Sequence, residues 1–136
     1  MTAELRFLSL PNVLRIHEYA LETDGGEPGI ADIGLLEAAL AMPESGSGGL
    51  YFHESLFAMA AAYAYHIVLN HPFVDGNKRV ALTCALAFLR DNGVEIYDKE
   101  EVLYDAILQL ISGEMDKSGF ARLLESLASP PDSISR

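Results

Sequence analysis

The residues best suited to chemistry lie in one short stretch, residues 71–79, whose sequence is HPFVDGNKR. Lys78 and Arg79 are its basic side chains, and they follow a long acidic and neutral run. Because a helix is predicted to begin here, free backbone N–H groups at Gly76, Asn77 and Lys78 can point at phosphate oxygens. Gly76 also permits a close backbone approach that a Cβ would obstruct. The stretch therefore predicts an anion site with phosphate as its ligand.

Two further residues of the stretch could carry out catalysis. Asp75 would repel a bare phosphate, but its hard carboxylate suits a Mg²⁺ ion that bridges nucleotide phosphates. Histidine side chains ionise close to neutral pH, so His71 could take a proton from an attacking hydroxyl. Phosphoryl-type transfer is catalysed largely by positioning and charge stabilisation, so a base, a metal ligand and an anion cradle are sufficient.

Structural interpretations of the same residues stay open at this point. Asp-Gly-Asn is common in turns, a His-Pro pair often ends a helix, and two cations can simply mark a solvated helix start. Phe73 is most simply an anchor that buries the loop in the core. His66, His71 and Asp75 could in principle form a metal hydrolase site, although no further ligand at helical spacing completes a zinc set.

Capping residues and apolar stripes predict six helices that would position this stretch. Ser9 and Pro11 are suited to open the first, Asp32 to cap the second, and Asp98 with Glu101 to form a capping box for the fifth. The predicted ranges are from Ser9-Leu10-Pro11 to about Glu22, from Asp32 to Pro43, an apolar helix ending near Asn70, Asn77–Asn92 with Gly93 as C-cap, Asp98 to Gly113, and about Ser118 to Ala128.

The segments between these helices are rich in glycine. Glycines and Pro28 break the chain before Asp32, and Pro43 to Tyr51 is predicted to be a mobile loop or small flap. We expect a single domain over residues 1–129 and a short polar tail over residues 130–136.

The other histidines receive structural interpretations. We expect His17 to be a half-exposed helix residue, His53 to lie at a helix start, and His66 to face the core or a neighbouring helix end.

The composition limits the class of protein. The chain has 136 residues, of which 50% are hydrophobic and 21% charged, and its formal net charge is −11. Such a chain can bury one core, which excludes intrinsic disorder and a multi-domain architecture. With 20 acidic residues against 9 Lys and Arg, few cations remain for a nucleic-acid surface, so we expect no direct nucleic-acid binding.

The single cysteine and one uncharged stretch bear on the cellular compartment. Cys84 cannot form an internal disulfide and lies among apolar residues, which predicts a buried thiol in a reducing cytoplasm. Residues 55–74 lack Asp, Glu, Lys and Arg and are long enough to cross a membrane. Polar His66 and Asn70 and the helix-ending Pro72 make insertion unfavourable, so we expect a buried helix and no membrane association.

Residues 71–79 resemble the signature of the Fic/Doc family, His-Pro-Phe-x-Asp/Glu-Gly-Asn-Gly/Lys-Arg, at every fixed position. The resemblance extends upstream through residues 25–32 and 34–40 and downstream through residues 88–93, so it covers most of the chain. The chain is similar to the short Doc (death-on-curing) branch. The resemblance implies an all-α Fic fold, a compact bundle of about six to seven helices with a small flap beside the active site. The Pro43 to Tyr51 segment is our candidate for that flap.

The resemblance also implies roles for individual residues. Fic/Doc enzymes move part of a nucleotide onto a hydroxyl of a target protein, with ATP and Mg²⁺. His71 would be the general base and Asp75 the Mg²⁺ ligand. Gly76 and Asn77 would form the anion nest, with Lys78 beside them and Arg79 as a phosphate contact.

Two departures bear on the reaction subtype. AMP-transferring members usually have Gly at the position of Lys78 and a second Arg at the position of Leu82. Both departures resemble the Doc branch, which transfers the terminal phosphate of ATP to a threonine of elongation factor Tu. Pro72 and Gly76 instead match AMP-transferring members. We favour phosphate transfer, with AMP transfer as the alternative and a catalytically inert Fic-fold binding module as a second alternative.

The resemblance further implies a regulatory partner. Many Fic proteins carry an inhibitory helix with a Ser/Thr-x-x-x-Glu-Gly/Asn motif, and the nearest match here, Thr23 to Glu27, is followed by Pro28. Proline and the neighbouring glycines exclude such a helix. We therefore expect a cognate antitoxin whose disordered segment folds on binding.

Overall fold

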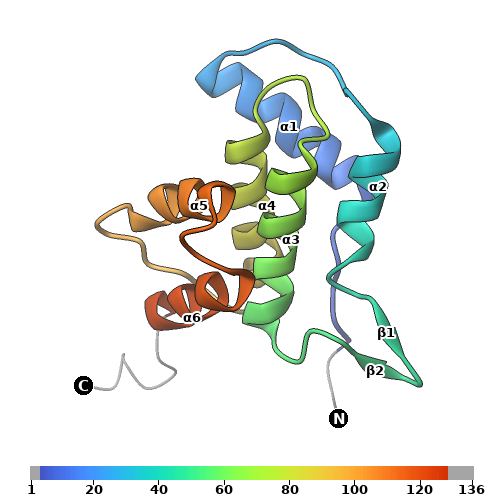
Figure 1. Ribbon diagram of the computed structural model, residues 1–136, viewed down its shortest axis with the longest axis vertical. Helices are drawn as coiled ribbons and strands as arrows, with labels where there is room; N and C mark the ends of the chain where they lie inside the picture. Colours follow the sequence, from blue (N-terminus) through green and yellow to red (C-terminus); the bar gives the residue numbers. More distant parts are fainter. Residues whose placement is uncertain (1–3, 129–136) are drawn as a thin grey trace.

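The computed structural model describes residues 4–128, and six helices form most of this region (Figure 1). The predicted tail, residues 130–136, lies outside the described residues, so the predicted division into domain and tail stays a prediction. The elements are α1 (Leu10–Asp24), α2 (Ile33–Ala41), β1 (Gly46–Ser47), β2 (Leu50–Tyr51), α3 (Leu56–Asn70), α4 (Asn77–Asp91), α5 (Val102–Ser112) and α6 (Lys117–Leu127). The predicted all-α fold is confirmed, with one two-stranded antiparallel hairpin formed by β1 and β2.

Side-chain caps fix where most of the helices begin. Ser9 accepts from the Asn12 N–H at the start of α1, and Asp32 accepts from the Leu35 N–H at the start of α2. These caps satisfy backbone N–H groups that have no partner inside the helix. Both were predicted from sequence.

The predicted capping box of the fifth helix is wrong in one respect. The Asp98 carboxylate does accept from the N–H groups of Val102 and Leu103, at 2.7 and 3.0 Å. However, Glu101 adopts a left-handed conformation with φ 56°, and α5 begins only at Val102. The chain turns once more before the helix because the Asp98 carbonyl accepts from the Glu101 N–H. Glu101 therefore lies outside the helix and cannot act as its N3 residue.

Helix α3 lies at the centre of the bundle and packs against α2, α4, α5 and α6 (Figure 1). Several alanines on different sides of this helix are fully buried, which allows neighbouring helices to approach closely. Cys84 of α4 is buried in this core as predicted, and burial raises the pKa of its thiol. The residues 55–74 that lack charge thus form α3 and the loop after it. Within residues 4–128, no helix has both the length and the apolar character needed to cross a membrane.

The two glycine-rich segments occupy different places. The hairpin of residues 46–51 precedes α3, at the opposite end of that helix from the loop joining α3 to α4 (Figure 1). Residues 25–32, which we call the flanking segment, lie along that loop instead. The Val74 N–H donates to the Gly29 carbonyl, and the N–H groups of Ala31 and Asp32 both donate to the Pro72 carbonyl. The expectation that Pro43–Tyr51 is the flap beside the site is therefore wrong, because loop composition does not determine where packing places a loop.

Candidate active site

A cavity of about 610 Å³ opens where the end of α1, the loop after α3 and helix α5 meet. All six residues that the sequence singled out line this cavity: His71, Asp75, Gly76, Asn77, Lys78 and Arg79. The structure thus brings the predicted site residues together in one place.

His71 ends α3 in a conformation that is unusual for a residue with a side chain. Its φ and ψ are 50° and 55°, in the left-handed region, and its N–H donates to the Ile67 carbonyl at 3.1 Å. Left-handed backbone costs roughly 1–2 kcal/mol for a residue other than glycine. Such strain persists where the surroundings impose it, and it is common at functional sites. The result is an exposed imidazole at the cavity.

Two buried residues hold the loop in shape from within. Phe73 is fully buried, which confirms its predicted role as an anchor. The buried side chain of Asn77 accepts from the Phe73 N–H at 3.0 Å and donates to the Phe73 carbonyl at 2.9 Å. Because the amide of Asn77 is engaged in this way, its contribution to an anion site comes from its backbone N–H.

The N-terminus of α4 faces the same cavity. Gly76 is its N-cap, with φ 87°, and no side chain caps the helix. The first helical hydrogen bond runs from the Val80 N–H to the Gly76 carbonyl, so the N–H groups of residues 77–79 precede it. A helix N-terminus carries partial positive charge, to which the exposed Lys78 and Arg79 add formal charge. This arrangement favours an anion such as phosphate.

Asp75 lies beside this helix end with an exposed carboxylate. Its Oδ1 accepts from the Gly76 N–H at 3.0 Å, and its Oδ2 accepts from the Glu27 N–H at 3.2 Å. One carboxylate at the edge of an anion site suits Mg²⁺, which usually takes one or two carboxylates and completes its shell with water and substrate phosphates. The donor set present therefore fits Mg²⁺ held together with a nucleotide.

The alternative zinc site is not formed. Within the described part of the chain, no three His, Cys, Asp or Glu side chains gather in a group that could hold a metal. His66 instead packs toward the start of α6, where Lys117 Nζ lies 3.1 Å from His66 Nε2 and 3.1 Å from His53 Nε2. We call these three residues the histidine–lysine cluster. The predicted position of His66 at a neighbouring helix end is confirmed.

Arg79 has two partners that the sequence did not indicate. Its Nε lies 3.1 Å from Asp24 Oδ2, with both side chains about half exposed, and its guanidinium lies 5.0 Å from the centre of the Tyr104 ring. Asp24 ends α1 and Tyr104 belongs to α5, and both line the cavity. Neither residue is near the signature in sequence, so only the packing of helices brings them to it.

The prediction for His17 is wrong. It is 6% exposed rather than half-exposed, and its Nε2 lies 2.9 Å from the Asp75 carbonyl oxygen. Its ring stacks on Phe73, with centres 3.9 Å apart. Val13, His17 and Ala20 are the buried residues of α1, and their helical spacing places them on one face. That spacing was a signal from which burial of His17 could have been predicted.

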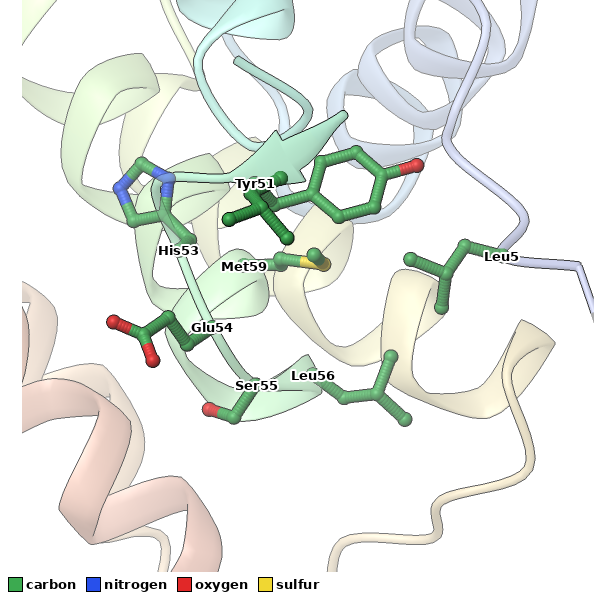
Figure 2. Close-up of a pocket in the computed structure, with 8 residues that line it drawn as sticks. Leu5, Tyr51, His53, Glu54, Ser55, Leu56 and Met59 are labelled. Carbon is green, nitrogen blue, oxygen red and sulfur yellow. The ribbon is translucent and has the colours of Figure 1, made fainter. Parts of the chain in front are cut away.

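A separate pocket of about 570 Å³ lies beside the hairpin. Figure 2 shows the side chains of Leu5, Tyr51, Leu56 and Met59 around it, so much of its wall is apolar. His53 and Glu54 also line it. The uncapped helix N-terminus that suits a phosphate belongs to the other cavity, which is therefore the stronger candidate for the active site.

Comparisons with known proteins show the family of the chain. The model of the Fic/DOC family matches residues 7–89, which include the whole signature. The chain is 34% identical to the protein kinase doc of Escherichia phage P1 over 125 residues, which are 90% of this chain and 96% of that protein. It is 43% identical to the toxin Doc of Mycolicibacterium smegmatis over 72 residues, which are 53% of this chain and 55% of that protein. By its fold, its signature and these relatives, the chain belongs to the Fic/DOC family.

Proposed function

We propose that this protein is a Doc-like toxin that transfers the terminal phosphate of ATP to a Ser or Thr hydroxyl of a target protein. The observation that carries the proposal is the cavity where His71, Asp75 and the uncapped N-terminus of α4 meet. The cavity is lined by an imidazole, a hard carboxylate and a helix N-terminus that suits phosphate, and this set of groups supports phosphoryl transfer.

The reaction assigns a task to each group. The His71 imidazole takes the proton of the target hydroxyl, whose oxygen forms a bond to the γ-phosphorus while the bond from that phosphorus to the bridging oxygen breaks and ADP leaves. Backbone N–H groups at the start of α4, with Lys78 and Arg79, hold the phosphate oxygens in line. Asp75 would hold the Mg²⁺ ion, which when bound neutralises phosphate charge.

One residue that favours phosphate transfer over AMP transfer stands where AMP-transferring members carry a second arginine. Leu82 stands there and is only 6% exposed, packed in the core of the bundle. Lys78, in place of the usual glycine, lines the cavity and adds a long cation beside the phosphate cradle. The phage relative is also named a protein kinase. Pro72 and Gly76, which match AMP-transferring members, keep AMP transfer as the alternative.

A toxin of this kind needs a partner that restrains it. Helix α1 ends at Asp24, and Gly25 follows with φ 78°, so residues 23–28 do not continue as an inhibitory helix. We therefore propose control by a cognate antitoxin, whose disordered segment would fold onto the toxin. This is consistent with a relative named as a toxin. Elongation factor Tu is the proposed target, and its modification would block translation.

Intact mass spectrometry of elongation factor Tu tests the proposal. The factor is incubated with the protein, ATP and Mg²⁺, and His71→Ala serves as the blank. A phosphate-sized gain that is absent from the blank supports the proposal, whereas an adenylyl-sized gain supports AMP transfer. No gain on this target, together with no Mg²⁺-dependent thermal shift by ATP, would favour the inert binding module. The shift should disappear in Asp75→Ala.

A further inference from the structure

The peptide unit between Asp75 and Gly76 belongs to two residues that line the candidate site. Its carbonyl oxygen is 2.9 Å from Nε2 of His17, a buried residue of α1. A carbonyl only accepts hydrogen bonds, so Nε2 carries the proton and donates. His17 and Asn77 are both buried, and the side chains of both bond to the backbone of this loop.

Anchoring this carbonyl also orients the N–H on the other side of the peptide bond. A trans peptide is planar, and its C=O and N–H point in opposite directions. With the Asp75 carbonyl turned inward to His17, the Gly76 N–H turns outward, where it donates to Asp75 Oδ1 at 3.0 Å. Asp75 and Gly76 both line the cavity. One hydrogen bond inside the protein therefore sets the direction of a donor at its surface.

Such an anchor is needed because Gly76 does not fix the peptide by itself. Gly76 has φ 87°, and glycine tolerates both positive and negative φ without a steric penalty. Rotation of this peptide would turn the Asp75 carbonyl toward the cavity and remove the N–H partner of the Asp75 carboxylate. A carbonyl oxygen at that place would repel phosphate.

We propose that His17 is a positioning residue of the nucleotide site, which holds the Asp75–Gly76 peptide so that the Gly76 N–H keeps the Asp75 carboxylate in place for Mg²⁺ and the Asp75 carbonyl stays turned away from the phosphates. This inference rests on the proposed function. His17 does not touch the substrate, and it acts through the peptide it binds.

The surroundings of His17 hold its ring in a fixed position. The imidazole stacks on Phe73 with an interplanar angle of 13°, and Gly76 lies beside the ring, so close that a Cβ at this residue would be 3.5 Å from His17 Cδ2. An aromatic hydrocarbon ring could provide this packing equally well. The donor on Nε2 is what distinguishes histidine, and it can be tested separately from the packing.

Two substitutions separate the donor from the ring. His17→Phe keeps a flat ring against Phe73 and removes the donor, whereas His17→Gln keeps an N–H donor at similar reach and removes the ring. We expect His17→Phe to weaken MgATP binding, measured by calorimetry, about tenfold and to lower kcat/KM for transfer roughly 10- to 100-fold, because misplaced groups lose catalytic alignment. His17→Gln should restore both to within about threefold.

A control variant accounts for general loss of stability. Tyr63→Phe removes a buried hydroxyl that accepts from the Leu8 N–H at 2.9 Å, away from the cavity. It should lower stability and leave MgATP binding unchanged. The proposal would be overturned if His17→Phe bound MgATP as tightly as the wild type. It would also be overturned if His17→Phe and Tyr63→Phe lost affinity for MgATP equally.

A third measurement separates this inference from the proposed function. The amide signal of Gly76 in a ¹⁵N-labelled sample reports the direction of that peptide without any nucleotide. We expect it to shift in His17→Phe and to return toward its wild-type position in His17→Gln. If the wild-type protein neither bound MgATP nor transferred phosphate, the proposed function would fail. An unchanged Gly76 signal in His17→Phe would overturn the role of His17 in either case.

Discussion

The candidate active site and the histidine–lysine cluster both gather basic groups around α3, but they use them in opposite ways. In the cluster, the Lys117 ammonium lies 3.1 Å from the Nε2 atoms of His53 and His66 and 5.4 Å from the centre of the Tyr65 ring. Two of its three donors therefore have acceptors inside the protein. At the candidate active site, the first turn of α4 has no side-chain cap, and Lys78 is exposed at the cavity. A functional site is marked here by donors that are left available to a ligand.

The backbone shows the same difference. His71 of the candidate site is left-handed, whereas His66 lies within the regular helix α3. Buried side chains, those of Phe73, Asn77 and His17, hold the strained loop in place. Packing thus maintains an arrangement that the loop alone would not favour.

The largest expected difference between the two regions is in catalysis. His71→Ala should lower the rate of transfer to the target roughly 100- to 10,000-fold, because general-base catalysis contributes that much. His66→Ala changes a histidine of the histidine–lysine cluster and should leave the transfer rate of the folded enzyme nearly unchanged. Initial rates of phosphate incorporation measure both. An equal loss in the two variants would mean that catalysis does not depend on the position of His71.

Glycines of the two glycine-rich segments should also respond differently. At Gly26, φ is +123° and a Cβ would lie 2.9 Å from Asp75 Oδ2, whereas Gly48 of the hairpin has φ +60° and open space. Backbone strain should lower the free energy of unfolding by about 1–2 kcal/mol in Gly48→Ala, where the backbone is left-handed. In Gly26→Ala, whose φ lies beyond that region, it should lower it by about 1–3 kcal/mol. In Gly26→Ala the new Cβ meets the end of an exposed carboxylate side chain, which can move aside, so this contact adds little to the loss of stability.

Ligand binding separates these two variants more clearly. Only Gly26→Ala displaces the Asp75 carboxylate, so only this variant should lose the Mg²⁺-dependent part of ATP binding. Urea denaturation and calorimetry measure the two effects. Wild-type binding of MgATP by Gly26→Ala would show that the flanking segment does not constrain Asp75.

The cluster should make the protein sensitive to acid. Burial, with Lys117 and His53 nearby, lowers the pKa of His66 from 6.5 to about 4, and burial with Lys117 lowers that of His53. Between pH 6.5 and about pH 4, His66 binds a proton in the unfolded chain but not in the folded chain. The stability contributed by the neutral histidines is therefore full above pH 6.5 and is lost as the pH falls toward 4.

The melting temperature as a function of pH tests this sensitivity. Wild-type Tm should fall by several degrees as the pH decreases through this window. His66→Gln, which stays neutral and can still accept from Lys117, should show a flatter profile. Identical slopes for the two proteins would assign the acid sensitivity to other groups.

The sequence was sufficient to predict the local parts of this site. The N-terminal caps at Ser9 and Asp32 and the six cavity residues come from short-range patterns, in which the interacting groups are close in the chain. The succession of helices along the chain could also be predicted, because segments rich in glycine and proline end one helix before the next begins.

The parts that sequence analysis missed depend on packing between distant elements. His17 lies 58 residues from Asp75 and Asp24 lies 55 residues from Arg79, so no local spacing links them. The two glycine-rich segments likewise have similar composition, and only the packing of α1 and α2 decides which of them lies along the signature. In physical terms, local propensity fixes the elements and tertiary contacts fix the neighbours.

The smallest expected effect concerns the contact between Asp24 and Arg79. Both side chains are about half exposed, and an ion pair of this kind is worth about 0.2–1 kcal/mol. A bound phosphate would compete with Asp24 for the same guanidinium. Asp24→Asn should therefore tighten MgATP binding about 1.5- to 5-fold, and the gain should shrink at high salt. The matched control is Asp91→Asn, which removes the partner of Arg90 at 3.8 Å and lies away from the cavity. Weaker binding by Asp24→Asn would instead mean that Asp24 holds Arg79 in the orientation that phosphate requires.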